Sequence, residues 1–425
     1  MLNQPVMNAP LRQLLRALLL ISLLLLPGVA QAQEPRVSIS VLTMGPGDPT
    51  FSKFGHNAIV VKQRRPRQAL VYNFGTFTFR SPNLVSDFLN RRLNYWLSVD
   101  TYEDTLRSYR AQNRTVIEQE LALSPEQSLA LAKALEVNAL RENRYYRYDY
   151  YFDNCSTRVR DALDRVLGGA IKKAAGPAAS QTFREHSLRL AGDDPLLFVG
   201  LDFGLSGYAD QPQSEWDEAF LPERFAALLR RVKIQAADGS VVPLVRSERV
   251  LFEADRAPPP EAPPQRLVPL LALGTVIGLA LAALGSRRES ALGRWCYGLS
   301  LLLLGLIVGA AGGLLLFFWL ATAHEAAWSN ANLLLAPPWL LALGVAGVAQ
   351  ARQASWGSRL LRLIVVATLA TSLLALLLNV TALSAQVTSR IAALLVPIWL
   401  GVAAAEVLAA RRAGTPQPWR VLFRL

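Results

Sequence analysis

Apolar residues follow two different patterns along the chain. From about residue 37 to residue 256, short apolar runs alternate with polar positions, as they do in a folded domain of strands and helices. Beyond residue 266, long apolar segments take over, and five of them are long enough to cross a bilayer: 267–284, 297–320, 333–348, 361–383 and 391–410. Pro337 and Pro338 interrupt the third. The pattern predicts a mixed domain followed by an all-α bundle of about five transmembrane helices.

The period of the apolar residues assigns individual elements in the first region. Alternation predicts strands at residues 36–44, 51–61, 69–74, 77–79, 94–99 and 115–121. Helical spacing predicts helices at residues 82–92, 102–111, 124–140, 155–167, 182–190 and 222–231. A hairpin is predicted at residues 232–244, around Asp238-Gly239. We therefore expect an α+β fold with an antiparallel sheet.

The N-terminus has the three parts of a secretion signal. Arg12 and Arg16 precede an apolar run at residues 17–26, and Ala30 and Ala32 form a small-residue cleavage site. Cleavage after Ala32 would leave an exported domain at residues 33–256, a proline-rich linker at 257–266, the membrane domain at 267–412 and a tail at 413–425. The alternative is an uncleaved anchor helix.

Basic residues between the predicted spans indicate the orientation. One set of loops carries three groups of arginines, whereas the alternate loops carry only Arg390. The positive-inside rule places the arginine-rich loops in the cytoplasm and leaves residues 321–332 and 384–390 outside, together with the linker. The cytoplasmic arginines account for most of the formal net charge of +12, so this charge does not indicate nucleic-acid binding.

The two cysteines lie on opposite sides of the membrane in this topology. Cys155 belongs to the exported domain and Cys296 to the cytoplasmic end of the second span, so they cannot form a disulfide. An unpaired thiol is a liability in an oxidising compartment, which favours a reactive role for Cys155. Cys296 is predicted to pack at the end of its span.

Cys155 also begins a predicted helix, because Asn154 is a good N-cap residue. The N–H groups and the dipole at a helix N-terminus favour thiolate, so we expect the pKa of Cys155 to be lowered. This position suits a nucleophile. The alternative is an inert cysteine that packs on the same helix face as Val159 and Ala162.

The chain has three histidines: His56, His186 and His324. His186 stands among charged residues and is predicted to lie on the surface. His56 opens an apolar strand, and a strand histidine beside a helix-start cysteine activates the thiol for acyl transfer. Asn73 on the neighbouring strand is the candidate to orient the imidazole, with Tyr72 as the alternative. These histidines and cysteines lack the spacing of a zinc site, so no metal or other cofactor is expected.

Three stretches of the chain resemble a known family. Residues 54–58, 72–77 and 148–158 together resemble the Lnb N-terminal periplasmic domain, which is related to permuted papain-like enzymes such as NlpC-type hydrolases and lecithin retinol acyltransferase. The resemblance extends over most of residues 37–231. It implies a permuted papain-like fold and a bacterial lipoprotein N-acyltransferase in which Cys155 is the nucleophile and His56 its base.

The same resemblance implies the substrates and the location. A phospholipid would donate the acyl chain, lipidated lipoproteins would accept it on their N-terminal amine, and the protein would lie in the bacterial inner membrane. Residues 323–335 resemble the polar loop between spans of this family, although a water-exposed connector is the alternative. His324, Glu325 and Asn330 are the candidates to bind a lipid headgroup or the amine. Asn154 and Tyr72 are further candidates for substrate binding.

Two other functions stay open at this point. A membrane-tethered hydrolase, such as a peptidoglycan amidopeptidase or a phospholipase, would use the same residues with water as the acceptor. A periplasmic sensing module would need no reactive cysteine at all.

Overall fold

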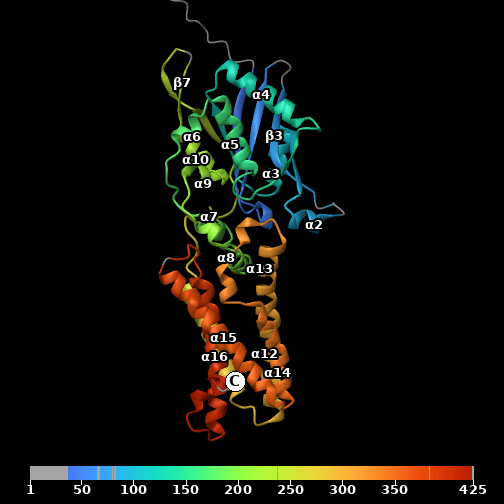
Figure 1. Ribbon diagram of the computed structural model, residues 1–425. Coiled ribbons are helices and arrows are strands. Elements are labelled where there is room, and N and C mark those ends of the chain that lie inside the picture. The colour runs from blue at the N-terminus through green and yellow to red at the C-terminus, as the bar shows by residue number, and fades with distance from the viewer. Residues whose placement is uncertain are drawn as a thin grey trace, which may run out of the picture. The chain divides into compact units, whose positions relative to one another are not determined.

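The first domain is built on an antiparallel seven-stranded sheet (Figure 1). The computed structural model describes residues 37–64, 68–78, 80, 83–236, 238–381 and 383–423, so the predicted secretion signal lies outside the described residues. The strand order is β6-β4-β3-β2-β1-β5-β9. Its strands are β1 (Val37–Met44), β2 (His56–Gln63), β3 (Gln68–Thr76), β4 (Asn94–Thr101), β5 (Val116–Leu121), β6 (Tyr145–Arg147) and β9 (Val245–Phe252). A separate hairpin pairs β7 (Lys233–Gln235) with β8 (Val241–Pro243).

Helices pack on both faces of this sheet. One face carries α4 (Pro125–Ala139), α5 (Cys155–Val166) and α10 (Pro222–Arg231), and the other carries α3 (Tyr102–Ala111). Successive strand residues point to opposite faces, so Ile59 of β2 joins the core under α5 while Val60 joins the core under α3. Full burial of a side chain such as Leu163 in α5 contributes about 1.5–3 kcal/mol. The sheet is thus fixed from both sides.

The structure confirms most of the predicted elements. Helices α3 and α10 have the predicted bounds, and α4 begins with the expected capping box of Ser124 and Gln127. Phe77 and Thr78 were wrongly predicted to lie in a strand, and α2 (Leu84–Leu89) is shorter than predicted. Helix α7 (Phe183–Leu190) was predicted. The elements not predicted from the sequence are β6, β9, α6 (Ala170–Ala174), α8 (Pro195–Gly204) and α9 (Glu215–Glu218). Most of the missed elements are too short for a periodic pattern.

The second domain is the expected helical membrane domain. Its helices are α11 (Leu267–Gly285), α12 (Ala291–Leu304) with η3 (Gly305–Gly309) and α13 (Ala310–Ala321), α14 (Ala342–Ala351), α15 (Ser355–Val380) and α16 (Ser389–Arg412). Within the described chain, four helices are long and apolar enough to cross a membrane, and a pair bent by 60°, Glu325–Leu334 with Pro338–Ala351, makes up to five. The bend falls at Pro337-Pro338, where proline interrupts the helical hydrogen bonds. The short helices are η1 (Thr50–Ser52), η2 (Gly207–Asp210), η4 (Glu325–Ala327), η5 (Ala331–Leu334), η6 (Pro338–Leu341) and η7 (Pro418–Phe423).

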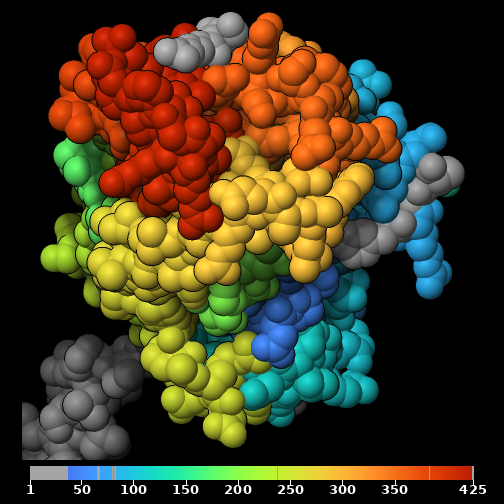
Figure 2. All heavy atoms as spheres, turned by 90° about the horizontal axis from the view of Figure 1, so that it is seen from below, coloured from blue at the N-terminus to red at the C-terminus, as the bar shows by residue number. Residues whose placement is uncertain are grey.

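Glycines allow α11 and α16 to pack closely, and the two helices lie side by side when seen from below (Figure 2). A Cβ atom on Gly278 would lie 2.2 Å from the carbonyl oxygen of Pro397, and one on Gly401 would lie 2.1 Å from that of Gly278. These helices therefore use the small-residue packing that is typical of membrane interiors, where backbone contact replaces the hydrophobic effect.

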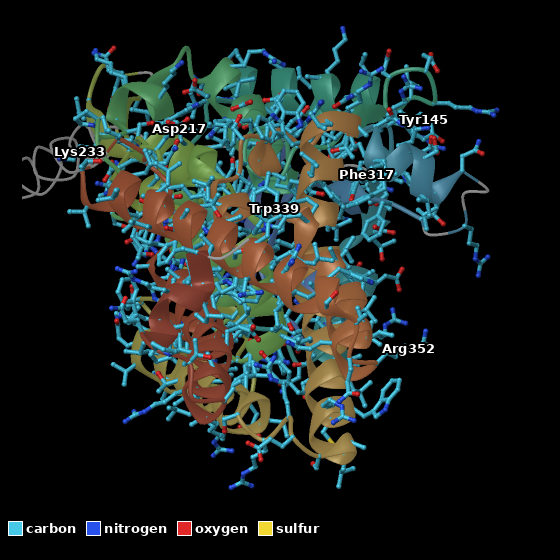
Figure 3. The ribbon with its side chains drawn as sticks, turned by 60° about the horizontal axis from the view of Figure 1, so that its bottom comes forward. Tyr145, Asp217, Lys233, Phe317, Trp339 and Arg352 are labelled. Carbon is cyan, nitrogen blue, oxygen red and sulfur yellow. The ribbon has the colours of Figure 1, made fainter. Side chains whose placement is uncertain are left out.

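The surface of the membrane domain carries exposed aromatic side chains. Phe317 of α13 and Trp339 of η6 are exposed, and Arg352 directly follows α14 (Figure 3). The two loops predicted to lie outside both contact the sheet domain. The Ala323 N–H donates to the Leu89 carbonyl oxygen at 3.0 Å, and Gln386 Nε2 donates to the Leu205 carbonyl oxygen at 3.3 Å.

Helix α8, which was not predicted from the sequence, belongs to the first domain and packs against the membrane domain. It has only ten residues, too few to cross a bilayer, and its Val199 and Phe203 pack against the core of the membrane helices. The amide of Asn330, in the loop after α13, donates to the carbonyl oxygens of Phe203 (3.0 Å) and Gly204 (2.9 Å). These bonds satisfy carbonyl groups that a helix end otherwise leaves without partners.

A buried ion cluster reinforces this connection. Asp202 of α8 accepts hydrogen bonds from Arg390 at 2.8 and 2.9 Å and lies 3.2 Å from Arg184 of α7. Arg184 also pairs with Asp210 at 2.8 Å. Both Asp202 and Arg184 are 1% exposed, so each charge depends on its partners rather than on water.

We expect Asp202→Asn to weaken this connection strongly, because it leaves the charge of Arg390 without its carboxylate. Breaking a buried ion pair by removing one partner costs about 3–5 kcal/mol. The Tm of the detergent-solubilised protein should therefore fall by several degrees. The control is Glu120→Gln, which removes an exposed pair with Arg246 (3.2 Å) worth about 0–1 kcal/mol. Equal Tm values for the two variants would contradict the structural role of Asp202.

Candidate active site

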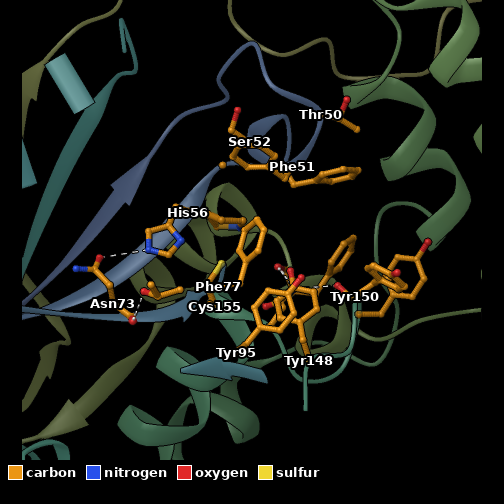
Figure 4. Close-up of a pocket in the computed structure, with 18 of the residues that line it drawn as sticks. Thr50, Phe51, Ser52, His56, Asn73, Phe77, Tyr95, Tyr148, Tyr150 and Cys155 are labelled. Atoms are coloured by element: carbon orange, nitrogen blue, oxygen red, sulfur yellow. Dashed lines mark hydrogen bonds between the residues drawn. The ribbon is translucent and has the colours of Figure 1, made fainter. Parts of the chain in front are cut away.

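One large cavity, of about 1200 Å³, contains both Cys155 and His56 (Figure 4). It lies where β2 begins, β3 ends and α5 begins, so three elements contribute its reactive side chains. The cavity is also lined by Phe318, His324, Ala326 and Ala327 of the membrane domain and by Leu201 and Leu205 in and after α8. A single space therefore extends from the cysteine to the membrane domain.

Hydrogen bonds at the start of α5 fix the position of Cys155. Asn154 Oδ1 accepts from the N–H groups of Ser156 (2.9 Å) and Thr157 (3.0 Å), and Thr157 Oγ1 accepts from the Asn154 N–H in return. The Ser156 hydroxyl lies 2.9 Å from Asn57 Oδ1 on β2. These contacts hold the first turn of the helix against the strand that carries His56.

Gly75 leaves the space that Cys155 occupies. A Cβ atom on Gly75 would lie 3.3 Å from the Cys155 Cβ, closer than most such contacts, and the residue has a φ of +89°. Both facts favour glycine at this position, where β3 bends away from the regular register.

His56 has a hydrogen-bonded support on one side of its ring. Its Nε2 lies 3.3 Å from Asn73 Oδ1, and Asn73 Nδ2 donates to Asp100 Oδ2 at 3.0 Å. Because Asp100 fixes which end of the amide faces the ring, Nε2 is the protonated nitrogen and Nδ1 carries the free lone pair. The ring of Tyr109 stacks on the imidazole with the centroids 6.2 Å apart. In Figure 4 the imidazole lies between Asn73 and Cys155.

Burial controls the charge state of both groups. It raises the pKa of Cys155, although the backbone N–H groups of Asn57, Ser156 and Cys155 itself act to lower it. Burial also lowers the pKa of His56 to about 4, helped by the charge of Arg114 and opposed by the hydrogen bond to Asn73. The predicted lowering of the Cys155 pKa was therefore wrong, because desolvation outweighs the helix-start donors. The resting pair is a neutral thiol with a neutral imidazole.

Aromatic rings form a continuous wall from the site to the membrane domain, which we call the aromatic wall. Its members are Phe51, Phe77, Tyr95, Tyr148 and Tyr150, followed by His324 and Phe318. Neighbouring rings have their centroids 4.3 to 6.1 Å apart, which is the usual range for aromatic contacts. Burial raises the pKa of Tyr148 well above its ordinary value, so this wall stays uncharged.

The other predicted site residues have different surroundings. Asn154 lines the cavity, but its amide is used by the N-cap bonds and by the carbonyl oxygens of Tyr150 and Phe220, both at 3.0 Å. Tyr72 is buried in the core beneath α5, and it is not among the described residues that line the cavity. His324 lines the cavity, and its Nε2 lies 2.9 Å from the Phe88 carbonyl oxygen.

The last two candidates lie in the connection between the domains. Asn330 is buried, with its amide bonded to α8 as described above and its Oδ1 accepting from Gln386 at 2.8 Å. Glu325 is largely exposed and lies 3.9 Å from Arg91. Neither residue is among the described residues that line the large cavity.

Three residues of the site were not predicted from the sequence, and the surroundings of one histidine were wrongly predicted. Asp100, Tyr109 and Arg114 line the cavity from the side of α3, and no local pattern marks them. His186 was wrongly predicted to be a surface residue: it is fully buried, with Nε2 2.7 Å from Glu218 and Nδ1 accepting from Arg189 at 3.0 Å. Among the residues described, no group of three or more His, Cys, Asp or Glu side chains is placed to hold a metal ion.

Two family models match the chain. The Lnb N-terminal periplasmic domain matches residues 29–187, and the Lnb transmembrane domain matches residues 264–402. The chain belongs to the Lnb family. This makes it a multi-pass membrane protein with a periplasmic domain, in a family that points to an enzyme of lipoprotein maturation. Searches of curated proteins and of solved structures gave no match.

We expect Cys155 of this Lnb-family protein to react slowly with iodoacetamide at pH 7. A raised pKa means that less thiolate is present at neutral pH than for an ordinary thiol, and the rate should rise only at a higher pH than it does for an ordinary thiol. The assay needs a Cys296→Ser background, because Cys296 is exposed in α12 rather than packed as predicted. The same protein unfolded in SDS should show an ordinary thiol pKa. Half-maximal reaction of the folded protein near pH 7 would contradict the assignment.

We expect Gly75→Ala to slow acylation of Cys155 by an acyl-like electrophile by at least about tenfold, because the new Cβ displaces the thiol. The matched control is Gly168→Ala. Gly168 also has a positive φ, +62°, but has open space around its Cβ position. Both variants should lose about 1 kcal/mol of stability, and only the first should lose reactivity. Equal acylation rates would show that the contact does not position Cys155.

Proposed function

We propose that this protein is a cysteine-dependent acyltransferase of the bacterial inner membrane. It moves an acyl chain from a phospholipid, through a thioester on Cys155, to the N-terminal amine of lipidated lipoproteins. The observation that carries the proposal is the continuous cavity from Cys155 to Phe318 and His324 of the membrane domain. An ester bond of a membrane lipid can reach the thiol through this space while its chains stay in apolar surroundings.

His56 serves as the general base for the thiol. Since Asn73 engages Nε2, the lone pair of Nδ1 is the one available to the Cys155 proton. Asn73 and Asp100 act as positioning residues, because they fix the tautomer and the plane of the ring. The low pKa of His56 keeps the imidazole neutral, and therefore able to accept a proton, at any pH well above about 4.

The first half-reaction forms the thioester. The Cys155 sulfur attacks the ester carbonyl carbon while its proton moves to His56 Nδ1. We expect the backbone N–H groups of Cys155 and Asn57, which favour negative charge on the sulfur, to stabilise the resulting oxyanion as well. The C–O bond then breaks, and the leaving alkoxide takes the proton from His56 to give a lysophospholipid.

The second half-reaction uses the same groups. The lipoprotein amine attacks the thioester carbonyl carbon and gives a proton to His56 Nδ1, and the C–S bond breaks as this proton returns to the Cys155 sulfur. The uncharged aromatic wall supports transfer to an amine rather than to water, because it surrounds the acyl chain with apolar side chains.

The membrane location of both substrates fits this arrangement. The acyl donor and the lipid anchor of the acceptor lie in the bilayer, and the exported domain is fixed to the membrane helices through α8 and Asp202. This connection supports delivery of both substrates to one cavity. A peptidoglycan amidopeptidase would gain nothing from an apolar path to the membrane.

We expect mass spectrometry of a lipoprotein N-terminal peptide to detect one added acyl chain when this protein is expressed in cells depleted of their own N-acyltransferase. Cys155→Ser should abolish the added chain, and His56→Ala should reduce the transfer rate by roughly a thousandfold or more. Gly168→Ala is a control that should keep activity.

The acceptor is tested in the same experiment. Release of free fatty acid and lysophospholipid without N-acylated peptide, dependent on Cys155, would assign the protein as a phospholipase instead. Absence of both products from cells that contain the protein in the membrane would contradict acyl transfer altogether.

A further inference from the structure

Arg114 is the exception among the buried arginines of the described chain. Four arginines are 5% exposed or less: Arg114, Arg160, Arg184 and Arg189. The last three each pair with a carboxylate, which belongs to Asp161 for Arg160, to Asp202 and Asp210 for Arg184, and to Glu223 for Arg189. No described carboxylate lies within ion-pair distance of Arg114. A buried charge without a counter-charge is costly, so this one needs another explanation.

Contacts of the guanidinium leave it partly unsatisfied. Nε donates to the Gly45 carbonyl oxygen at 2.8 Å, Nη1 lies at the long distance of 3.5 Å from Gln112 Oε1, and Nη2 has no hydrogen-bond partner among the described residues. The Tyr109 ring lies under the group, with the guanidinium carbon 4.7 Å from the ring centroid. These contacts hold Arg114 in one orientation and leave the N–H groups of Nη2 without an acceptor among the described residues.

Arg114 lines the same cavity as Cys155 and His56, and we call the part of the cavity that it lines together with residues of β4 and α3 the polar end. Ser98, Asp100, Asp104, Thr105, Ser108 and Gln112 line this end as well. Of the two carboxylates, Asp104 pairs with Arg107 at 2.6 Å, and Asp100 accepts a hydrogen bond from the neutral amide of Asn73 at 3.0 Å. Arg114 is the one lysine or arginine among the described residues that line the cavity.

We infer that Arg114 forms a phosphate-binding subsite that takes the phosphodiester group of the donor phospholipid. Guanidinium groups bind phosphate oxygens through charge-assisted hydrogen bonds, and an anion there neutralises the buried charge. In a glycerophospholipid the phosphate and the ester bonds are attached to the same glycerol. A phosphate at the polar end would therefore hold the ester carbonyl groups near Cys155 and direct the acyl chains along the aromatic wall.

This inference rests on the proposed function for the identity of the ligand, but it can be tested without any acyl transfer. The probe is a dialkyl ether phospholipid, which has a phosphodiester but no cleavable ester, and its partner is the dialkyl ether glycerol that lacks the phosphate. Binding of each is measured to the full-length Cys155→Ser protein in detergent micelles, with and without Arg114→Gln.

We expect Arg114→Gln to weaken binding of the ether phospholipid by roughly 10- to 100-fold, the effect of losing hydrogen bonds to a charged group. Binding of the ether glycerol should change by no more than about twofold, because it makes no contact with Arg114. Arg114→Lys keeps the charge without the planar pair of donors and should give an intermediate loss. The control is Arg256→Gln, which removes the same charge from a residue that pairs with Asp48 at 3.2 Å and does not line the cavity.

Three results would overturn the inference. Equal weakening for the two lipids would mean that Arg114 supports only the fold. If Arg114→Gln left lipid binding unchanged but raised the pKa of Cys155, as measured by the pH dependence of alkylation in the protein with intact Cys155, Arg114 would act on the thiolate alone. Inorganic phosphate that binds as tightly as the ether phospholipid would mark a free-phosphate site. Failure of acyl transfer with phosphate-dependent lipid binding intact would instead count against the proposed function and leave the subsite in place.

Discussion

The hydrogen bonds of Asn154 and Ser156 at the start of α5 are the contacts on which the rest of the site depends. Asn154 closes the first turn of the helix, and Ser156 ties that turn to Asn57, the residue next to His56. Nucleophile and base come from segments about a hundred residues apart in the chain, and the bond between Ser156 and Asn57 joins these two segments. Gly75 completes the arrangement by leaving room for the thiol.

Burial of the site has two consequences that oppose each other. It raises the pKa of Cys155 and lowers that of His56, so the resting pair carries no charge and its thiol is a poor nucleophile. The same desolvation excludes the water that would hydrolyse a thioester. In the proposed acyl transfer, this exclusion of water would protect the thioester until the acceptor amine arrives.

The sequence predicted those parts of the molecule that have a local signal. Asn154 before an apolar helix, glycine before His56 and the capping box at Ser124 are all short-range patterns, and the elements they mark are found in the structure. Partners distant in the chain left no such pattern. Three features depend on segments that meet only in the fold: the burial of His186, the unpartnered Nη2 of Arg114 among the described residues and the packing of α8 against the membrane helices. The prediction for the pKa of Cys155 was wrong for the same reason, because burial of the thiol depends on the whole domain.

Helix α8 joins the sheet domain, which carries Cys155 and His56, to the membrane helices. An apolar helix of ten residues has no stable place in water and cannot span a bilayer, so it is stabilised where the sheet domain meets the membrane helices. Its carbonyl groups are satisfied by Asn330, and its Asp202 is neutralised by Arg184 and Arg390. Each of these polar groups would be costly if the two domains separated, which favours one fixed alignment. That alignment keeps the aromatic wall continuous from Tyr148 to Phe318, and with it the path that we propose for a lipid to Cys155.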